Sequence, residues 1–425
     1  MPAGGLPAWP SALAFLAMAS LVSYRAVSIL NVPGPPSSTF WALADFRDAI
    51  YYPVIAFLHG HNPYDVVLYR QTYPVLQKFL YPPLALVVHL PFGFLPFERA
   101  ELIYFVGTLA LTLLLAMVTL RAAGVADTAG NVFGLGAAIL ASRPGQWTVV
   151  LGQVTLQMVI ASYLALGLAR DRPGLASLAV AFTMIKPTFG VPLAALMLAR
   201  GDVRPVAVGV VLAAVPSLVA TAVLVHVAGG IGPLIESLRA DLAFSAYGSF
   251  TDVRALTSRS RIDIVTLVAH LAGRDLGRAV GTGLGLVVVG LGCVTVARLA
   301  RRGERAGLPP ITTGVVCMTM LLCTYHNAYD GVLLTLPAVQ LALAPPPPLL
   351  ARPGLRRLML LLVLVPAVNY LGTTTMLATL GIPESLQALP IVLNAAALLV
   401  ALVLYLRLAW QIPHTSRDIE SGLTT

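Results

Sequence analysis

Long apolar runs separated by short polar stretches cover almost the whole chain. A helix that spans a bilayer needs about 20 mainly apolar residues, and about eleven to thirteen segments of this chain are candidates on that criterion. The pattern therefore predicts an all-α, polytopic integral membrane protein with a single membrane domain over residues 1–410. Little sequence remains for a soluble domain.

The clearest runs predict helices at residues 11–30, 101–120, 205–226, 279–299, 309–324, 331–345, 357–376 and 388–410. Shorter or interrupted runs lie at residues 81–97, 131–142, 149–169 and 173–199. The last of these contains Lys186 and Pro187, and a proline removes a backbone hydrogen bond that lipid cannot replace. This segment is therefore either one kinked span or two short re-entrant helices.

Two long polar stretches, residues 31–79 and 227–278, and a polar tail at 411–425 interrupt or end the apolar pattern. Positive charge marks cytoplasmic loops, and two groups of arginines fit that rule: Arg301, Arg302, Arg305, Arg352, Arg356 and Arg357. Counting spans from these groups places residues 227–278 on the outer face of the cell membrane, and a cytoplasmic N-terminus places residues 31–79 on the same face. The tail is predicted to be disordered and cytoplasmic, and the topology of residues 121–204 stays open.

The composition agrees with a membrane protein, since 58% of the residues are hydrophobic and 11% are charged, against about 25% charged in soluble domains. The net charge of +9 comes from arginine clusters at segment ends, without the aromatic interleaving of a nucleic-acid site. We therefore expect membrane lipids and no nucleic acid as partners. Cys293, Cys317 and Cys323 match no zinc or disulfide spacing.

The first long departure from the apolar pattern is residues 42–65, ALADFRDAIYYPVIAFLHGHNPYD. In a helix, Asp45 and Asp48 share one face and Tyr52 follows four residues after Asp48. The pattern predicts an interfacial amphipathic helix whose acidic stripe points away from lipid. Pro53 should kink this helix or divide it into short pieces.

Asp45 and Asp48 are the candidate catalytic residues, because charged groups at a membrane interface are functional by default. Either carboxylate could act as the general base that takes a proton from a sugar hydroxyl. Two alternatives stay open: a solvated surface face, or a divalent-metal site built from the two carboxylates. We expect no metal and no cofactor.

The other candidates would contact substrate. Lys186 either meets a phosphate as a point charge or snorkels from a helix end. His326 and Asp330 lie four residues apart and either share a structural hydrogen bond or contact a phosphate or sugar.

Arginine offers a bidentate fork to phosphate, so Arg254 or Arg261 in the second polar stretch is a candidate ligand. Gln153 could bind a sugar hydroxyl or bridge helices. Tyr81 precedes two prolines that favour a helix start, and is a candidate contact from that turn.

The motifs DFRDAIYY, GHNPYD, YPPLALVVHLPFGFLP, LGQVTLQ, MIKPTFGVPLAALMLAR and YHNAYDGVLLTLPAVQLAL follow one another in that order. In this order the chain resembles glycosyltransferase family 87, the polyprenyl-phosphate-mannose-dependent mannosyltransferases of the GT-C superfamily, from about Phe40 to about Leu343. The resemblance implies inverting transfer of mannose from a polyprenyl-phosphate donor to a lipid-linked or cell-envelope glycan at the outer face. It also implies an Asp of the first outer loop as general base. The Asp-to-Tyr interval favours Asp48 with Tyr52 as its partner, and the Asp-Phe dipeptide favours Asp45.

Two other functions use the same polar residues. A transporter or flippase of a polar lipid would place them near the middle of the membrane with access to both faces. A non-catalytic membrane scaffold is the weaker third hypothesis.

Overall fold

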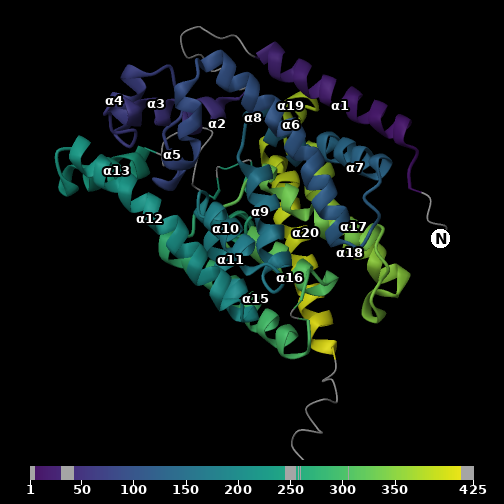
Figure 1. Ribbon diagram of the computed structural model, residues 1–425. Helices are drawn as coiled ribbons and strands as arrows, with labels where there is room; N and C mark the ends of the chain where they lie inside the picture. Colours follow the sequence, from purple (N-terminus) through teal and green to yellow (C-terminus); the bar gives the residue numbers. More distant parts are fainter. Residues whose placement is uncertain are drawn as a thin grey trace, which may run out of the picture.

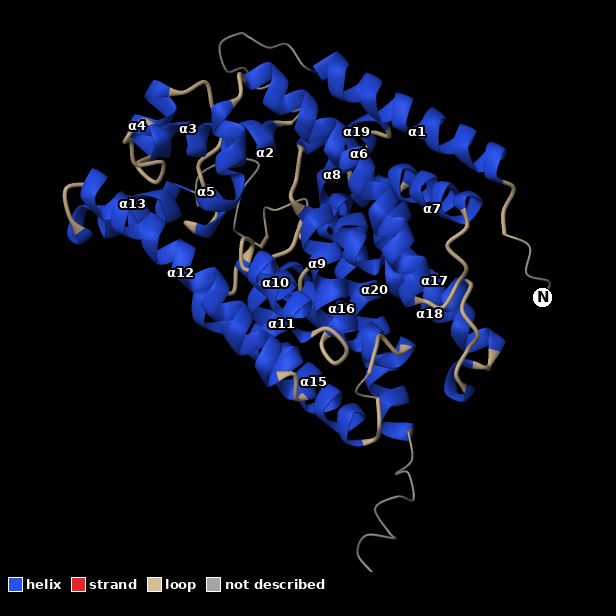
Figure 2. Ribbon diagram, in the orientation of Figure 1, coloured by secondary structure: helices blue, strands red, loops and turns tan. Residues whose placement is uncertain are grey.

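The computed structural model describes residues 5–29, 43–244, 255–256, 258, 260–304 and 306–412. These residues form helices and connecting loops, and their β-structure is confined to one isolated antiparallel bridge between Arg261 and Asn327. Figure 2 shows helices throughout the molecule. The prediction of an all-α membrane protein is confirmed.

Five helices in the described part of the chain are long and apolar enough to cross a membrane. They are α6 (Phe97–Ala122), α12 (Val203–Val227), α15 (Gly277–Arg301), the run Pro353–Gly372 that begins with α18 (Pro353–Val368), and α20 (Glu384–Gln411). These long helices lie close to where the apolar pattern predicts them. The apolar pattern gave about eleven to thirteen candidate segments. Fewer long helices are found because breaks divide several of these segments into shorter helices of 10–17 residues.

The broken segments follow the interruptions in the sequence. Pro187 begins α11 (Pro187–Arg200) just after the end of α10 (Pro173–Thr183), so residues 173–199 form two short helices. Helices α8 (Arg143–Leu151) and α9 (Thr155–Leu168) meet at a bend of 118°. The remaining short apolar helices are α5 with η2 (Leu84–Phe94), α7 (Ala129–Ala141), α16 (Pro310–Cys323) and η3 with α17 (Ala328–Ala342).

The centre of the molecule is α16, whose residues after Pro310 are all buried. It packs against α11, α15 and α20, and Figure 1 shows it among these helices. Small residues allow the close approach, since a Cβ on Gly285 would lie 2.2 Å from the Cys323 carbonyl oxygen and one on Gly314 2.2 Å from the Tyr405 ring. Close packing of small residues is a main source of helix association in membranes.

The first polar stretch folds into short helices at one end of the molecule, next to α13 (Ile231–Phe244). They are α2 (Ala44–Phe46), the π-helical turn η1 (Arg47–Tyr51), α3 (Tyr52–Leu58) and α4 (Val66–Thr72). The buried Lys78 side chain, just after them, forms an ion pair with Asp241 of α13 at 3.3 Å. The second polar stretch contains α13 and α14 (Ile264–Ala272).

The prediction of an interfacial amphipathic helix at residues 44–52 is wrong in one respect. Residues 43–51 are buried on every side, so the acidic side chains point away from lipid but into protein and not into solvent. Pro53 lies in the first turn of α3, directly after the π-helical turn η1, and the run consists of the short pieces α2, η1 and α3, as predicted.

The contact between Gly314 and Tyr405 gives a stability prediction. Gly314→Ala should lower the free energy of unfolding by about 1–3 kcal/mol, because the added methyl overpacks the buried Tyr405 ring. Gly290→Ala in α15 is the matched control, since a Cβ there meets nothing within 4 Å. The control should be neutral or gain up to about 1 kcal/mol of helix propensity. Thermal unfolding in detergent measures both, and equal midpoints for the two variants would contradict this packing.

Candidate functional site

Asp45 lies in α2, at the start of the helical run over residues 44–58, which is called the Asp45 helix below. The start of this helix contacts the break between α8 and α9. The Leu43 N–H donates to the Val150 carbonyl oxygen at 2.6 Å, and Gln153 Nε2 donates to Asp45 Oδ2. Leu43 has a left-handed backbone, φ 49° and ψ 23°, which costs a non-glycine residue about 1–2 kcal/mol. The surrounding packing therefore fixes how the chain enters the Asp45 helix.

The break between α8 and α9 depends on Gly152, which ends α8 with φ +70°. A Cβ there would lie 2.9 Å from the Phe46 Cβ and 3.0 Å from Leu43 Cδ2. Glycine is thus favoured twice, once by the backbone conformation and once by the close approach of the Asp45 helix. Just beyond it, Gln153 reaches Asp45 and Thr155 Oγ1 donates to Asp330 Oδ1 at 2.9 Å.

Asp330 lies between two basic side chains. Its carboxylate accepts from Lys186 Nζ at 2.6 Å and lies 2.9 Å from His326 Nδ1. The other ring nitrogen of His326 is 3.1 Å from the Thr188 carbonyl oxygen, so both nitrogens face acceptors, as an imidazolium can satisfy. With His326 in that form, the three groups carry a net positive charge.

Aromatic and amide groups continue this cluster. Lys186 Nζ lies 4.9 Å from the centre of the Tyr329 ring. Asn327 Nδ2 donates to the hydroxyl oxygens of Tyr325 and Tyr329 at 3.1 and 2.9 Å. The Arg261 guanidinium stacks over the Tyr325 ring at 5.0 Å.

The two candidate carboxylates of the first loop have different surroundings. Asp48 is fully buried, and its oxygens accept from Arg47 Nε at 2.6 Å, from the Gln77 N–H at 2.8 Å and from the Leu76 N–H at 3.0 Å. In the described part of the chain Asp45 forms no ion pair, and its hydrogen bonds come from the amides of Gln153 and Gln77. Asp48 is therefore saturated by a cation and two backbone donors, whereas Asp45 is not.

Burial, together with the negative charge of Asp48, raises the pKa of Asp45 to about 7. The hydrogen bond from Gln153 and the positive charge of Lys186 act in the opposite direction. Asp45 therefore titrates near neutral pH and feels the charge of Lys186. Burial also raises the pKa of Asp48, although Arg47 and the two backbone donors oppose the rise.

A large, mainly apolar cavity adjoins the basic cluster. Its volume is about 990 Å³, and it lies between α11 and α15, with apolar walls from side chains such as Val191, Leu286 and Val289. Its polar lining consists of Arg261, Asp275, Arg278, Thr282, Thr324 and Tyr325, and the last two directly precede His326 in sequence. Arg261 is itself paired with Asp263 at 2.8 and 2.9 Å.

The structure brings most of the predicted residues together, namely Asp45, Tyr81, Gln153, Lys186, Arg261, His326 and Asp330. Tyr81 belongs to the group because its hydroxyl donates to Gln153 Oε1 at 3.4 Å. Tyr52 instead packs among aromatic rings, stacked on Phe97 at 5.6 Å and tilted against Tyr73. Arg254 lies outside the described residues.

Sequence reasoning missed several members of the site. Thr155 is two residues after Gln153, and only the bend turns it toward Asp330. Asn327 is next to His326 and Arg47 is next to Asp48 in the sequence. Being adjacent to a predicted site residue is the sequence feature that could have identified them. No group of three or more His, Cys, Asp or Glu side chains in the described ranges is suited to hold a metal ion.

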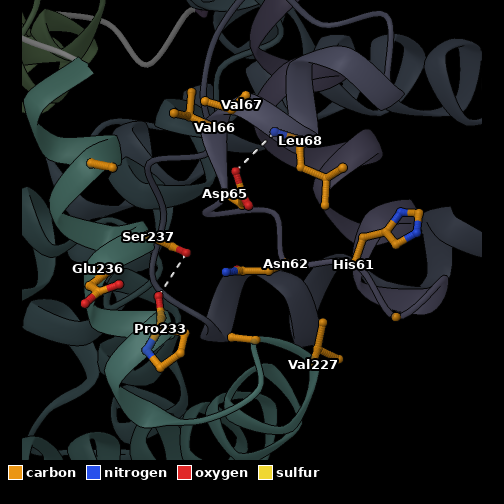
Figure 3. Close-up of a pocket in the computed structure, with 13 residues that line it drawn as sticks. His61, Asn62, Asp65, Val66, Val67, Leu68, Val227, Pro233, Glu236 and Ser237 are labelled. Carbon is orange, nitrogen blue, oxygen red and sulfur yellow. Dashed lines mark hydrogen bonds between the residues drawn. The ribbon is translucent and has the colours of Figure 1, made fainter.

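A second cavity of about 480 Å³ lies between the loop before α4 and the junction of α12 with α13 (Figure 3). Its polar side chains serve local structure, since Asp65 accepts from the Leu68 N–H at 3.1 Å and Ser237 donates to the Pro233 carbonyl oxygen at 3.1 Å. It shares no lining residue with the group around Asp45 and Asp330.

Comparison with known proteins gives one family match. The model of glycosyltransferase family 87 matches residues 79–324, more than half of the chain. Asp45, His326 and Asp330 lie outside the matched segment, whereas Tyr81, Gln153, Lys186 and Arg261 lie within it. No curated protein and no solved structure matches the chain significantly. By the extent of the family match, together with its membrane-spanning helices, this chain belongs to glycosyltransferase family 87 and is a membrane glycosyltransferase.

Proposed function

We propose that this glycosyltransferase moves mannose from a polyprenyl-phosphate donor to a hydroxyl of a lipid-linked or cell-envelope glycan, with inversion. The observation that carries the proposal is the Asp45–Gln153 pair, which lies beside the Lys186–Asp330–His326 cluster and an apolar cavity. The reaction is proposed to take place at the outer face of the cell membrane, the face expected for the first polar stretch if the N-terminus is cytoplasmic. Family membership favours transfer over transport.

Asp45 is the proposed general base. A base works best when its pKa is near the operating pH, and burial raises the pKa of Asp45 to about 7. The amide of Gln153 orients the carboxylate without the charge of an ion pair. Asp48, held by Arg47 and two backbone donors, keeps the Asp45 helix and residues 76–77 in place.

The donor phosphate is proposed to bind at the basic cluster. Lys186 and His326 supply positive charge, and the Asp330 carboxylate between them fixes their positions. The polyprenyl chain would occupy the apolar cavity between α11 and α15, and Arg261 in its lining would meet the phosphate. A mainly apolar cavity with arginines in its lining matches a lipid with a charged head.

The proposed reaction is a single displacement. The acceptor oxygen forms a bond to the anomeric carbon of the sugar as the bond from that carbon to the phosphate oxygen breaks. The hydroxyl proton moves to the Asp45 carboxylate, and the polyprenyl phosphate leaves with the bonding electrons. One carboxylate suffices because phosphate is a good leaving group, unlike the paired carboxylates of glycoside hydrolases.

Transfer from labelled polyprenyl-phosphate mannose to a panel of glycan and lipid-linked acceptors tests the proposal. Purified protein in detergent should transfer label, and polyprenyl-phosphate glucose and a nucleotide sugar serve as alternative donors. Transfer from the nucleotide sugar but from neither polyprenyl phosphate would refute the proposed donor class. Transfer from the glucose donor alone would refute mannose only.

Asp45→Asn should lower kcat/KM by at least about a hundredfold, because it removes the base, and should leave the thermal midpoint unchanged or raised. Asp48→Asn should act through stability, since loss of a buried charge pair costs about 3–5 kcal/mol. Activity assays and thermal unfolding of both variants separate the two roles. A folded, inactive Asp48→Asn protein beside an active Asp45→Asn protein would reverse the assignment.

The pH dependence of kcat/KM should follow the protonation of the Asp45 carboxylate. A base must be deprotonated, so kcat/KM should fall as the pH drops below the Asp45 pKa of about 7. The positive charge of Lys186 lowers that pKa, so Lys186→Gln should move the acid limb to higher pH and raise the KM for the donor. Arg121→Gln, on the exposed pair with Asp127, is the control. An acid limb that stays fixed in Lys186→Gln would contradict the proposed coupling.

A further inference from the structure

A third cavity lies at the far end of α15, away from the proposed transfer site. Its volume is about 310 Å³, and it is lined by Val294, Ala297, Arg298, Arg301, Arg302 and Trp410. Residues of α15 also line the apolar cavity, from Gly277 to Val289. A helix of 25 residues is about 37 Å long, so the two cavities lie toward opposite ends of one membrane-spanning helix.

The lining of this cavity is strongly positive. Three of its six described lining residues are arginines, and none of the six carries a carboxylate. The nearest acidic side chain in sequence, Glu304, accepts from the Thr312 hydroxyl at 2.6 Å. Three guanidinium groups in so small a space repel one another unless an anion joins them.

Two of the arginines have buried donors without a partner. The Nε atoms of Arg298 and Arg302 are buried, and no described residue accepts a hydrogen bond from either. Arg302 is 9% exposed. A buried N–H of a charged group without an acceptor is costly, and such groups in folded proteins point to an unseen partner.

The rim of the cavity is apolar and exposed. Arg298 stacks its guanidinium over the Trp410 ring at 4.4 Å and donates to the Trp410 carbonyl oxygen at 3.1 Å. Trp410 is 55% exposed and Val294 58%. Tryptophan is enriched at the level of lipid headgroups, so a ligand here would meet guanidinium groups inside and apolar side chains at the opening.

We propose that this cavity binds the phosphate headgroup of an anionic phospholipid from the adjoining leaflet. The phosphate accepts from the guanidinium groups of Arg298 and Arg302, which line the cavity, and Arg301 adds charge from the exposed side. The acyl chains lie along Val294 and the Trp410 ring. The inference is independent of which sugar the enzyme transfers.

The test is lipid binding by the full-length protein after removal of bound lipid in detergent. Native mass spectrometry with phosphatidylglycerol or phosphatidylcholine should show preferential retention of phosphatidylglycerol. Near a membrane each arginine contributes about 1 kcal/mol, or about fivefold in affinity. Arg298→Gln and Arg302→Gln should each weaken phosphatidylglycerol binding by about that factor.

Arg352→Gln/Arg357→Gln, which removes exposed arginines outside the cavity, is the matched control and should bind as the wild type does. If Arg298→Gln or Arg302→Gln folds poorly, two other measurements replace them. Arg301→Gln should also weaken phosphatidylglycerol binding, and added salt should weaken binding by the wild type because the site is charge-driven. Equal retention of the two lipids, or an equal loss in the control, would overturn the proposal. So would glycerol phosphate binding as tightly as phosphatidylglycerol, because the site would then take a free phosphate.

Discussion

The break between α8 and α9 is the constraint on which the candidate site depends. Gly152 turns the chain with a positive φ and lets the Asp45 helix approach to a distance that a Cβ would prevent. Directly after Gly152, Gln153 donates a hydrogen bond to Asp45 and Thr155 donates one to Asp330. A straight helix through residues 143–168 could not direct two successive polar side chains at these two carboxylates. The bend therefore couples the first polar stretch to the basic cluster.

Several buried charges in the described part of the chain are paired with an opposite charge, whereas Asp45 is not. Ion pairs join Arg47 to Asp48, Arg261 to Asp263, Lys78 to Asp241 and Lys186 to Asp330. Breaking such a pair leaves a buried charge uncompensated, at a cost of about 3–5 kcal/mol. Asp45, 7% exposed, instead receives amide donors. Burial raises its pKa to about 7, and groups with perturbed pKa values cluster at functional sites.

Much of the fold could be read from apolar runs, because a membrane helix needs a minimum apolar length and shows it in sequence. The ranges of α6, α12, α15, α16 and α20 follow the predicted segments closely, and Lys186-Pro187 correctly marked a division into two helices. The burial of residues 43–51 could not be read in this way. Charged residues in a short amphipathic pattern suit an interface as well as an interior, and the partners that pair them lie elsewhere in the chain.

The sequence by itself determined an all-helical membrane protein, the positions of its long helices and the family to which it is similar, since these follow from local composition and residue order. It also singled out Asp45, Asp48, Lys186, His326 and Asp330 because ionisable groups are rare in this chain. Only the tertiary structure distinguished Asp45 from Asp48. The two are three residues apart in one helical run, and what separates them is Arg47 beside Asp48 and the groups brought from residues 76–77 and 153. Hydrogen bonds between segments that are distant in sequence leave no local sequence pattern. The different surroundings of Asp45 and Asp48 are therefore visible only in the tertiary structure.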